Sequence, residues 1–120
     1  MAFTAGTSVF KGEQAYSKSE AMELIRSTAS LTDKPIVYLS AGVTNAAFIE
    51  SLEMAAASGA NFHGVLCGRA TWQEGVPVFV QHGPQALLDW LGTIGLQNVR
   101  NVNDALSAAA PWHAAGSMQS

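Results

Sequence analysis

The stretches PIVYLSAGV (residues 35–43) and FHGVLCGR (residues 62–69) decide the fold. Each begins with a short apolar run that is typical of a strand buried on both faces of a sheet. Between them, residues 45–58 carry apolar side chains at helical spacing, with Thr44 or Asn45 as the cap and Gly59 after the last turn. Strand to strand spans about 30 residues, the size of one βαβ unit. We therefore expect parallel strands near 36–40 and 63–67, joined by a right-handed crossover with helices on the outer side.

The flanking segments carry clear signals upstream and weaker ones downstream. Residues 17–20 (SKSE) form a capping box that predicts a helix over 18–30, after a loose lead-in over 1–16. Residues 68–72 could start a helix, and residues 85–91 predict another that ends at Gly92 or Gly95. Asn101 or Asn103 predicts the cap of a last helix through Ala109, and we expect the tail over 111–120 to be frayed.

Composition limits both the architecture and the partners. The 120 residues are too few for a complete (β/α)8 barrel, which needs about 250. Apolar residues make up 48%, which excludes a disordered chain, whereas charged residues make up only 12%. So few charges indicate a segment that more protein covers, or an oligomer. The net charge of −3 argues against partners such as nucleic acid or an anionic membrane.

Cysteine content and the chain start point to the cytosol. Cys67 is the single cysteine, so an internal disulfide is excluded. The first residues lack the basic region and apolar core of a signal peptide, and no run is typical of a membrane span. We expect a cytosolic protein.

Candidate chemistry lies where the two expected strands end, because parallel α/β folds bind ligands at the carboxyl ends of their strands. Leu39 to Gly42 and Leu66 to Arg69 are these ends. Arg69 is the only charged residue between Glu53 and Glu74, and a guanidinium at the end of a buried strand needs a partner. A phosphate or carboxylate ligand and a structural ion pair are both open from its position. Ser40 is equally open, as a ligand or as a turn former.

Other chemistry-bearing residues favour structural roles. Cys67 is expected as a small core residue, and Trp72 and Trp90 as core or interface residues. No metal site is expected, because the histidines have no partner at ligand spacing, and neither a Walker A loop nor GxGxxG occurs. The histidines in question are His63, His82 and His113.

The two strand ends resemble a known family. PIVYLSAGV and FHGVLCGRATW (residues 62–72) look like the last two strands of class I tagatose 1,6-bisphosphate aldolases. The likeness continues through residues 86–98 and back to YSKSEA at residues 16–21, so that it covers roughly residues 9–112. Sulfofructosephosphate aldolases are a related, less close match.

The resemblance implies an α/β fold, a TIM (β/α)8 barrel, of which residues 1–120 would form the last two βα units. It implies a metal-independent lyase without a cofactor that cleaves tagatose 1,6-bisphosphate to dihydroxyacetone phosphate and glyceraldehyde 3-phosphate through a lysine Schiff base. The residues matching the family's phosphate-binding positions are Ser40, Gly42, Leu66, Gly68 and Arg69.

The family's catalytic lysine lies on the sixth strand, upstream of everything matched here. We therefore expect no catalytic residue in this chain, which alone would be an inactive fragment. Its implied partners are a phosphorylated sugar and either further copies of itself or the missing N-terminal part of the barrel.

Two alternatives differ in class. A signalling receiver domain is a doubly wound module of this length, and residues 35–41 resemble its fourth strand. A receiver needs an early acidic pair and a phosphoacceptor aspartate, whereas the first aspartate here is Asp33. The other alternative is a non-catalytic remnant that oligomerises.

Overall fold

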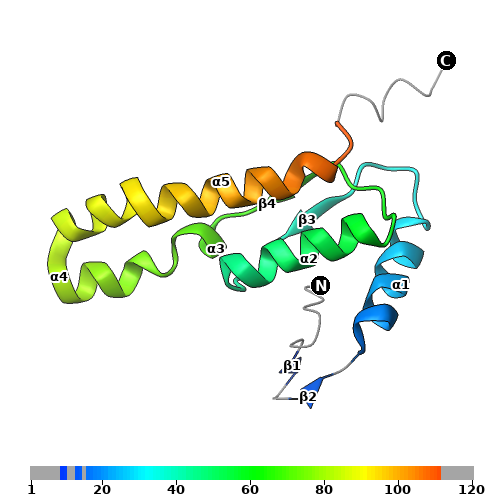
Figure 1. The fold of residues 1–120 in the computed structure, drawn as a ribbon, viewed down its shortest axis with the longest axis horizontal. Helices are drawn as coiled ribbons and strands as arrows, with labels where there is room; N and C mark the ends of the chain where they lie inside the picture. The colour runs from blue at the N-terminus through cyan, green and yellow to red at the C-terminus, as the bar shows by residue number, and fades with distance from the viewer. Residues whose placement is uncertain (1–8, 11–12, 15, 112–120) are drawn as a thin grey trace.

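The computed structural model describes residues 9–10, 13–14 and 16–111 (Figure 1). Two short strands, β1 (Val9–Phe10) and β2 (Glu13–Gln14), pair antiparallel. This pair corrects the loose lead-in expected over residues 1–16, because two residues between strands is the commonest hairpin spacing. The rest of that lead-in, before Tyr16, lies outside the described residues.

The expected βαβ unit is present. Strands β3 (Val37–Leu39) and β4 (Gly64–Leu66) pair parallel, with Tyr38 opposite Val65, and α2 (Asn45–Ala57) connects them. The Thr44 hydroxyl caps α2 by accepting a hydrogen bond from the Ala47 amide at 3.2 Å. Gly59 follows the helix with a φ of 77°, a left-handed conformation that favours glycine.

The capping box is also confirmed. Helix α1 (Lys18–Ala29) begins where the Ser17 hydroxyl accepts from the Glu20 amide at 3.3 Å. The Glu20 carboxylate in turn accepts from the Ser17 amide at 2.8 Å. Each residue thereby satisfies a backbone donor that a helix start leaves free.

The sheet is covered on one face only, which corrects the expectation of strands buried on both faces. Side chains alternate along β3, so that Tyr38 packs against the core while Val37 and Leu39 are exposed. Leu66, opposite Leu39, is 66% exposed. The apolar run predicted two covered faces, but the described helices pack against one.

The core lies between that covered face and the helices. Its largest fully buried side chains are Leu52, Met54 and Phe62, and the Phe62 ring lies 5.2 Å from the Tyr38 ring, centroid to centroid. The remaining buried members come from α1, α2, α3 and α5: Ala21, Ile25, Phe48, Ala55, Ala70 and Val102. These contacts fix α1 and α2 over the sheet.

The C-terminal part is helical throughout. After α3 (Arg69–Trp72), the chain forms α4 (Gly75–Trp90), a π-helix η1 (Leu91–Gly95), α5 (Leu96–Ala105) and a final 3₁₀ turn η2 (Leu106–Ala108). Gly83, with a φ of 84°, bends α4 just before Pro84. The chain thus runs away from the sheet, turns, and returns with α5 beside α2 (Figure 1).

Two sequence-based predictions for this part are wrong. The helix does not end at Gly92 or Gly95 but continues as η1 and α5, and Asn101 and Asn103 lie inside α5 instead of capping a new helix. The reason is packing around Trp90. A Cβ on Gly95 would lie 3.2 Å from the Trp90 ring, and one on Gly75 would lie 2.9 Å from it. Both glycines therefore make room for a buried indole and do not break the helix.

The expected frayed tail lies outside the described residues, apart from Pro111. No helix in the described ranges is long and apolar enough to cross a membrane. The cytosolic location stays a prediction.

Candidate functional site

The first element of the site is the tight turn that follows β3. The Ser40 amide donates to the Leu66 carbonyl at 3.2 Å, and the Ser40 carbonyl accepts from the Val43 amide at 3.1 Å. Ala41 and Gly42, the two central residues, have φ values of 52° and 81°. A non-glycine residue in this region costs about 1–2 kcal/mol. Such strain is concentrated at functional sites, so the turn directs attention to this edge of the sheet.

Arg69 joins the two strand ends. It begins α3, directly after β4, and its guanidinium lies against the Gly42 backbone. A Cβ on Gly42 would lie 3.2 Å from the guanidinium carbon and 3.2 and 3.3 Å from its two terminal nitrogens. Any larger residue at position 42 would displace the guanidinium. Gly42 is therefore required both by its φ and by the approach of Arg69.

No carboxylate of residues 16–111 pairs with the Arg69 guanidinium. The one salt bridge within this range joins Arg26 to Glu23, and the Arg69 side chain forms no hydrogen bond with these residues. The structural ion pair considered from the sequence is thus not formed there. Arg69 is also exposed, which corrects the premise that it is a buried charge in need of a partner. Residues 16–111 thus leave its donors open to an anion, and a guanidinium offers a planar fork that matches phosphate oxygens.

Ser40 is buried behind the turn, next to Cys67. Only 4% of Ser40 is exposed, and its side chain hydrogen-bonds the Cys67 thiol. Burial raises the pKa of Cys67, and the hydrogen bond from Ser40 opposes part of that rise. Cys67 packs against the core as expected and favours the neutral thiol. The Ser40 backbone forms the turn, and its position at the strand end keeps it beside the corner, so both roles considered from the sequence stay open.

Leu66 and Gly68 contribute backbone to the same edge. The Leu66 carbonyl accepts from Ser40, and its side chain points to the exposed face of the sheet. The Gly68 carbonyl accepts from the Thr71 amide at 2.9 Å and from the Thr71 hydroxyl at 2.7 Å, which holds the start of α3. All five residues expected at the phosphate site thus lie at one edge, here called the strand-end corner: Ser40, Gly42, Leu66, Gly68 and Arg69.

Amide side chains that sequence reasoning missed hold this corner together. Gln73 donates to the Val43 carbonyl at 3.0 Å and so ties the end of α3 to the turn. Asn98 of α5 donates to the Thr71 carbonyl at 3.0 Å, and Asn45 of α2 donates to the Asn98 carbonyl at 3.3 Å. Gln73 and Asn45 lie at helix ends, where the sequence gives no signal for a contact 30 or 53 residues away. The network positions Arg69 through α3.

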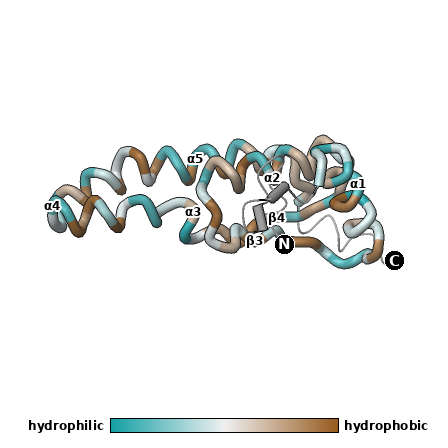
Figure 2. Tube along the Cα trace, turned by 90° about the horizontal axis from the view of Figure 1, so that it is seen from below, coloured by the Kyte–Doolittle hydropathy of each residue, from teal (hydrophilic) through white to brown (hydrophobic). Residues whose placement is uncertain are grey.

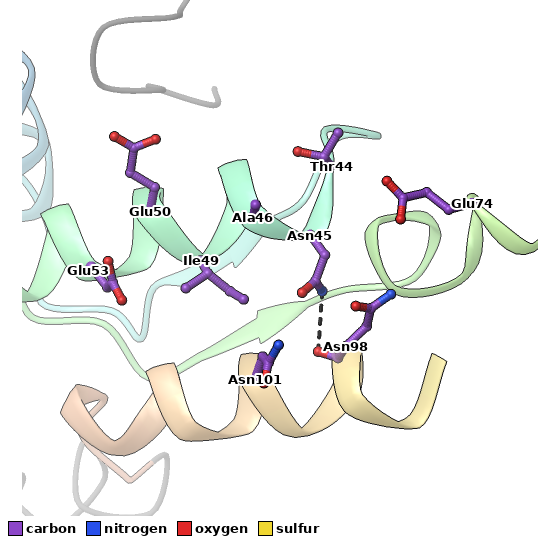
Figure 3. A pocket seen from close by; sticks show the side chains of 9 residues that line it. All are labelled: Thr44, Asn45, Ala46, Ile49, Glu50, Glu53, Glu74, Asn98 and Asn101. Atoms are coloured by element: carbon purple, nitrogen blue, oxygen red, sulfur yellow. Dashed lines mark hydrogen bonds between the residues drawn. The ribbon is translucent and has the colours of Figure 1, made fainter. Parts of the chain in front are cut away.

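A groove of about 540 Å³ lies between α2 and α5 (Figure 3). Three carboxylates and three asparagine amides line it together with Thr44, Ala46 and Ile49: Glu50, Glu53, Glu74, Asn45, Asn98 and Asn101. Asn45 and Asn98 meet across it (Figure 3). Because the carboxylates repel anions, this groove is not where a phosphate would bind.

The remaining chemistry-bearing residues lie elsewhere. The His63 Nδ1 accepts from the Ile36 amide at 3.1 Å and so supports the start of the sheet. Within the described ranges no group of three His, Cys, Asp or Glu could hold a metal, and His113 lies outside them. Trp90 is a core residue as expected, whereas Trp72 is 46% exposed. Lys34 is exposed and precedes β3, at the end of the strand opposite the corner.

Comparison with known proteins gives consistent matches. A family model described as DeoC/LacD family aldolase matches residues 2–74. The chain is 47% identical over 102 residues to tagatose 1,6-diphosphate aldolase 2 of Streptococcus pyogenes serotype M1, and 48% identical over 103 residues to that of Streptococcus mutans. It is 44% identical over 102 residues to tagatose 1,6-diphosphate aldolase of Lactococcus lactis.

These alignments cover 84–85% of the chain and 31% of each relative. The chain thus spans about a third of the length of the curated relatives it matches, in their C-terminal part.

Proposed function

Because this chain belongs to the DeoC/LacD family of aldolases, we propose that it supplies part of the phosphate-binding site of a class I ketose-bisphosphate aldolase. The proposed substrate is tagatose 1,6-bisphosphate, cleaved to dihydroxyacetone phosphate and glyceraldehyde 3-phosphate through a lysine Schiff base. The names of its relatives support the substrate class. In this proposal β3 and β4 are the last two strands of a (β/α)8 barrel, where a phosphate site commonly lies. Family membership also argues against the receiver-like alternative.

The contact between Arg69 and Gly42 is the observation that carries the proposal. This contact holds the Arg69 guanidinium at the carboxyl ends of two parallel strands. No carboxylate of residues 16–111 forms a salt bridge with it. A phosphate there would receive charge-assisted hydrogen bonds from the guanidinium fork. Because the guanidinium lies close to the backbone of the Ser40–Val43 turn, we expect the phosphate to be held against that turn as well.

The chemical step needs groups that these residues do not supply. A Schiff-base lysine must be desolvated or lie beside another cation, and proton transfer needs positioned acids or bases. Lys18 and Lys34 are exposed, and Lys34 lies at the opposite end of β3 from the corner. Lys11 lies outside the described residues. We infer that the chain by itself binds phosphate and does not cleave sugar.

Phosphate binding is tested by titrating the isotope-labelled chain with inorganic phosphate and following amide chemical shifts. We expect shifts around Gly42 and Gly68. Loss of one charge-assisted contact costs about 1.5–3 kcal/mol, so Arg69→Ala should weaken binding by about tenfold to a hundredfold.

Arg100→Ala is the matched control, because Arg100 is an exposed arginine on α5 and outside the corner. Lys34→Ala should likewise leave the affinity for phosphate unchanged. Equal loss in Arg69→Ala and Arg100→Ala would show a diffuse charge effect and contradict the site.

The absence of cleavage is tested with borohydride and dihydroxyacetone phosphate. We expect no reduced adduct by mass spectrometry on the 120-residue chain, whereas a full-length tagatose 1,6-diphosphate aldolase should be trapped under the same conditions. An adduct on Lys34 would contradict the inference that this chain carries no catalytic lysine.

A further inference from the structure

Trp72 is a large aromatic side chain that lies outside the core. It ends α3, which lies where the chain leaves the sheet for α4 (Figures 1 and 2). The sequence predicted a core or interface role for both Trp72 and Trp90, but Trp72 is 46% exposed whereas Trp90 is 9% exposed. An indole presents an apolar ring and a polar N–H, which bind different kinds of partner. The proposed function gives Trp72 no role, although it lies three residues after Arg69.

The indole of Trp72 lies over the strand-end corner. A Cβ on Gly68, one of the corner residues, would lie 3.9 Å from the indole Nε1. In the same way, a Cβ on Gly42 would lie 3.2 Å from the Arg69 guanidinium. The two side chains thus lie over the glycines that follow the two paired strands, with the indole beside β4 and the guanidinium beside the turn after β3.

Arg69 and Trp72 also share one face of α3. Residues three apart on a helix are neighbours, with about 5–6 Å between their Cβ atoms. Both side chains are exposed. Because each N–H donor lies about 2.7–3.2 Å from the oxygen that it binds, a single phosphate can accept hydrogen bonds from both side chains at once.

The Trp72 N–H has no hydrogen-bond partner in the described part of the chain, and the backbone around it is held in place. On one side, the Thr71 carbonyl accepts from Asn98 at 3.0 Å. On the other side, Gln73 donates to the Val43 carbonyl at 3.0 Å. Only the χ1 and χ2 torsions of the indole remain to be ordered when a ligand binds, so the entropic cost of using this donor is low.

We propose that Trp72 is a further substrate-binding residue of the strand-end corner, whose indole N–H donates a hydrogen bond to the phosphate held by Arg69. An indole N–H donates and cannot accept, so the ligand atom that it contacts must be an acceptor, as every phosphate oxygen is. The guanidinium supplies charge, and the indole supplies a second, neutral donor that restricts how the phosphate is oriented. This inference rests on the proposed phosphate site and adds a residue that the resemblance to the aldolases does not imply.

The test follows the indole N–H resonance of Trp72 by NMR while inorganic phosphate is added to the isotope-labelled chain at constant ionic strength. We expect this resonance to shift with the same half-saturation as the Gly42 amide, whereas the resonance of the buried Trp90 indole should stay in place. Trp72→Phe identifies the resonance and keeps an aromatic ring without the donor. It should raise the dissociation constant for phosphate by about threefold to tenfold. The effect is smaller than that of Arg69→Ala because the lost donor is neutral.

Phe79→Leu and Trp72→Leu form a matched pair. Phe79 is 48% exposed, nearly the same fraction as Trp72, and lies on α4 outside the corner. Phe79→Leu should leave the affinity for phosphate unchanged, while Trp72→Leu should weaken it as much as Trp72→Phe does. Circular dichroism should be unchanged in all three variants, since both side chains are outside the core. Weaker binding in Trp72→Leu but not in Trp72→Phe would overturn the proposal, because the ring and not the N–H would then bind the ligand.

Failure of this inference is distinguishable from failure of the phosphate site. Phosphate could shift the Gly42 and Gly68 amides while the Trp72 indole resonance and the affinity of Trp72→Phe stay unchanged. That result would overturn the indole hydrogen bond and leave the phosphate site standing. If the corner amides do not respond and Arg69→Ala changes nothing, the phosphate site itself is wrong, and the role of Trp72 is overturned with it.

Discussion

The two long helices within residues 16–74 and the helix α4 of residues 75–95, here called the arm, begin in different ways. In the first region, the Ser17 and Thr44 hydroxyls cap α1 and α2. In the arm, α4 begins at Glu74 without a side-chain cap, and its bend depends on Gly83. The first region also holds most of the buried core, whereas the arm buries chiefly Trp90. Where local hydrogen bonds set a boundary, the boundary can be located in the sequence. Where packing sets it, the sequence signal misleads.

The largest expected difference between the regions is in core energetics. Leu52 on α2 is 0% exposed, so Leu52→Ala should lower the free energy of unfolding by about 2–5 kcal/mol. Leu88→Ala in the arm removes the same atoms from an exposed position and should change it by about 0.5 kcal/mol or less. Urea denaturation measures both. Equal losses of unfolding free energy in the two variants would mean that the arm is as tightly packed as the core, which would contradict the proposed difference between the regions.

The second prediction concerns the packing that overrides helix signals in the arm. Gly75→Ala places a Cβ 2.9 Å from the Trp90 ring and 3.0 Å from Leu87, so we expect a loss of about 1–3 kcal/mol. Gly92 has nothing within 4 Å of a Cβ. Gly92→Ala should therefore stabilise the helix by up to about 1 kcal/mol. Thermal denaturation distinguishes the pair, and a stable Gly75→Ala variant would remove Trp90 as the reason that the helix continues.

The third prediction compares two glycines of positive φ within residues 16–74, one of which contacts Arg69 while the other does not. Gly42→Ala and Gly59→Ala should each cost about 1–2 kcal/mol of unfolding free energy, because both sites are left-handed. Only at Gly42 would the new Cβ also meet the Arg69 guanidinium. Phosphate titration should therefore fail in Gly42→Ala and persist in Gly59→Ala. Unchanged binding in both would separate the turn from the anion site.

The smallest expected effect is at the cap of α1. Ser17→Ala should lower the free energy of unfolding by about 1 kcal/mol. The hydrogen bonds from the Ser17 hydroxyl and amide lower the pKa of Glu20 below its ordinary value of 4.5. A lowered folded-state pKa contributes stability that is present above the ordinary value and lost as pH falls through the lowered one.

The stability difference between the unaltered chain and Glu20→Gln should thus be present at pH 7 and shrink below the ordinary pKa. Denaturation at a series of pH values measures it. A difference that does not change with pH would assign the effect to packing and not to the charge.

The sequence by itself determined the parts whose signals are local. The capping box, the Thr44 cap, Gly59 and the two parallel strands all depend on residues within a few positions of each other, or on one helical crossover. It also indicated Arg69 and the two strand ends as the place for an anion, because their order along a βαβ unit brings them to one edge.

Tertiary structure alone decided which sheet face is covered, where the helices end and how Arg69 approaches Gly42. Each of these features depends on residues that are far apart in the chain. An apolar strand cannot specify whether one or both faces are covered, and here one face of β3 and β4 is exposed. Gly95 is an ordinary helix terminator until the Trp90 ring lies over it. The approach of the Arg69 guanidinium to Gly42 likewise exists only once β3 and β4 are paired and Gln73 and Asn98 hold α3 in place.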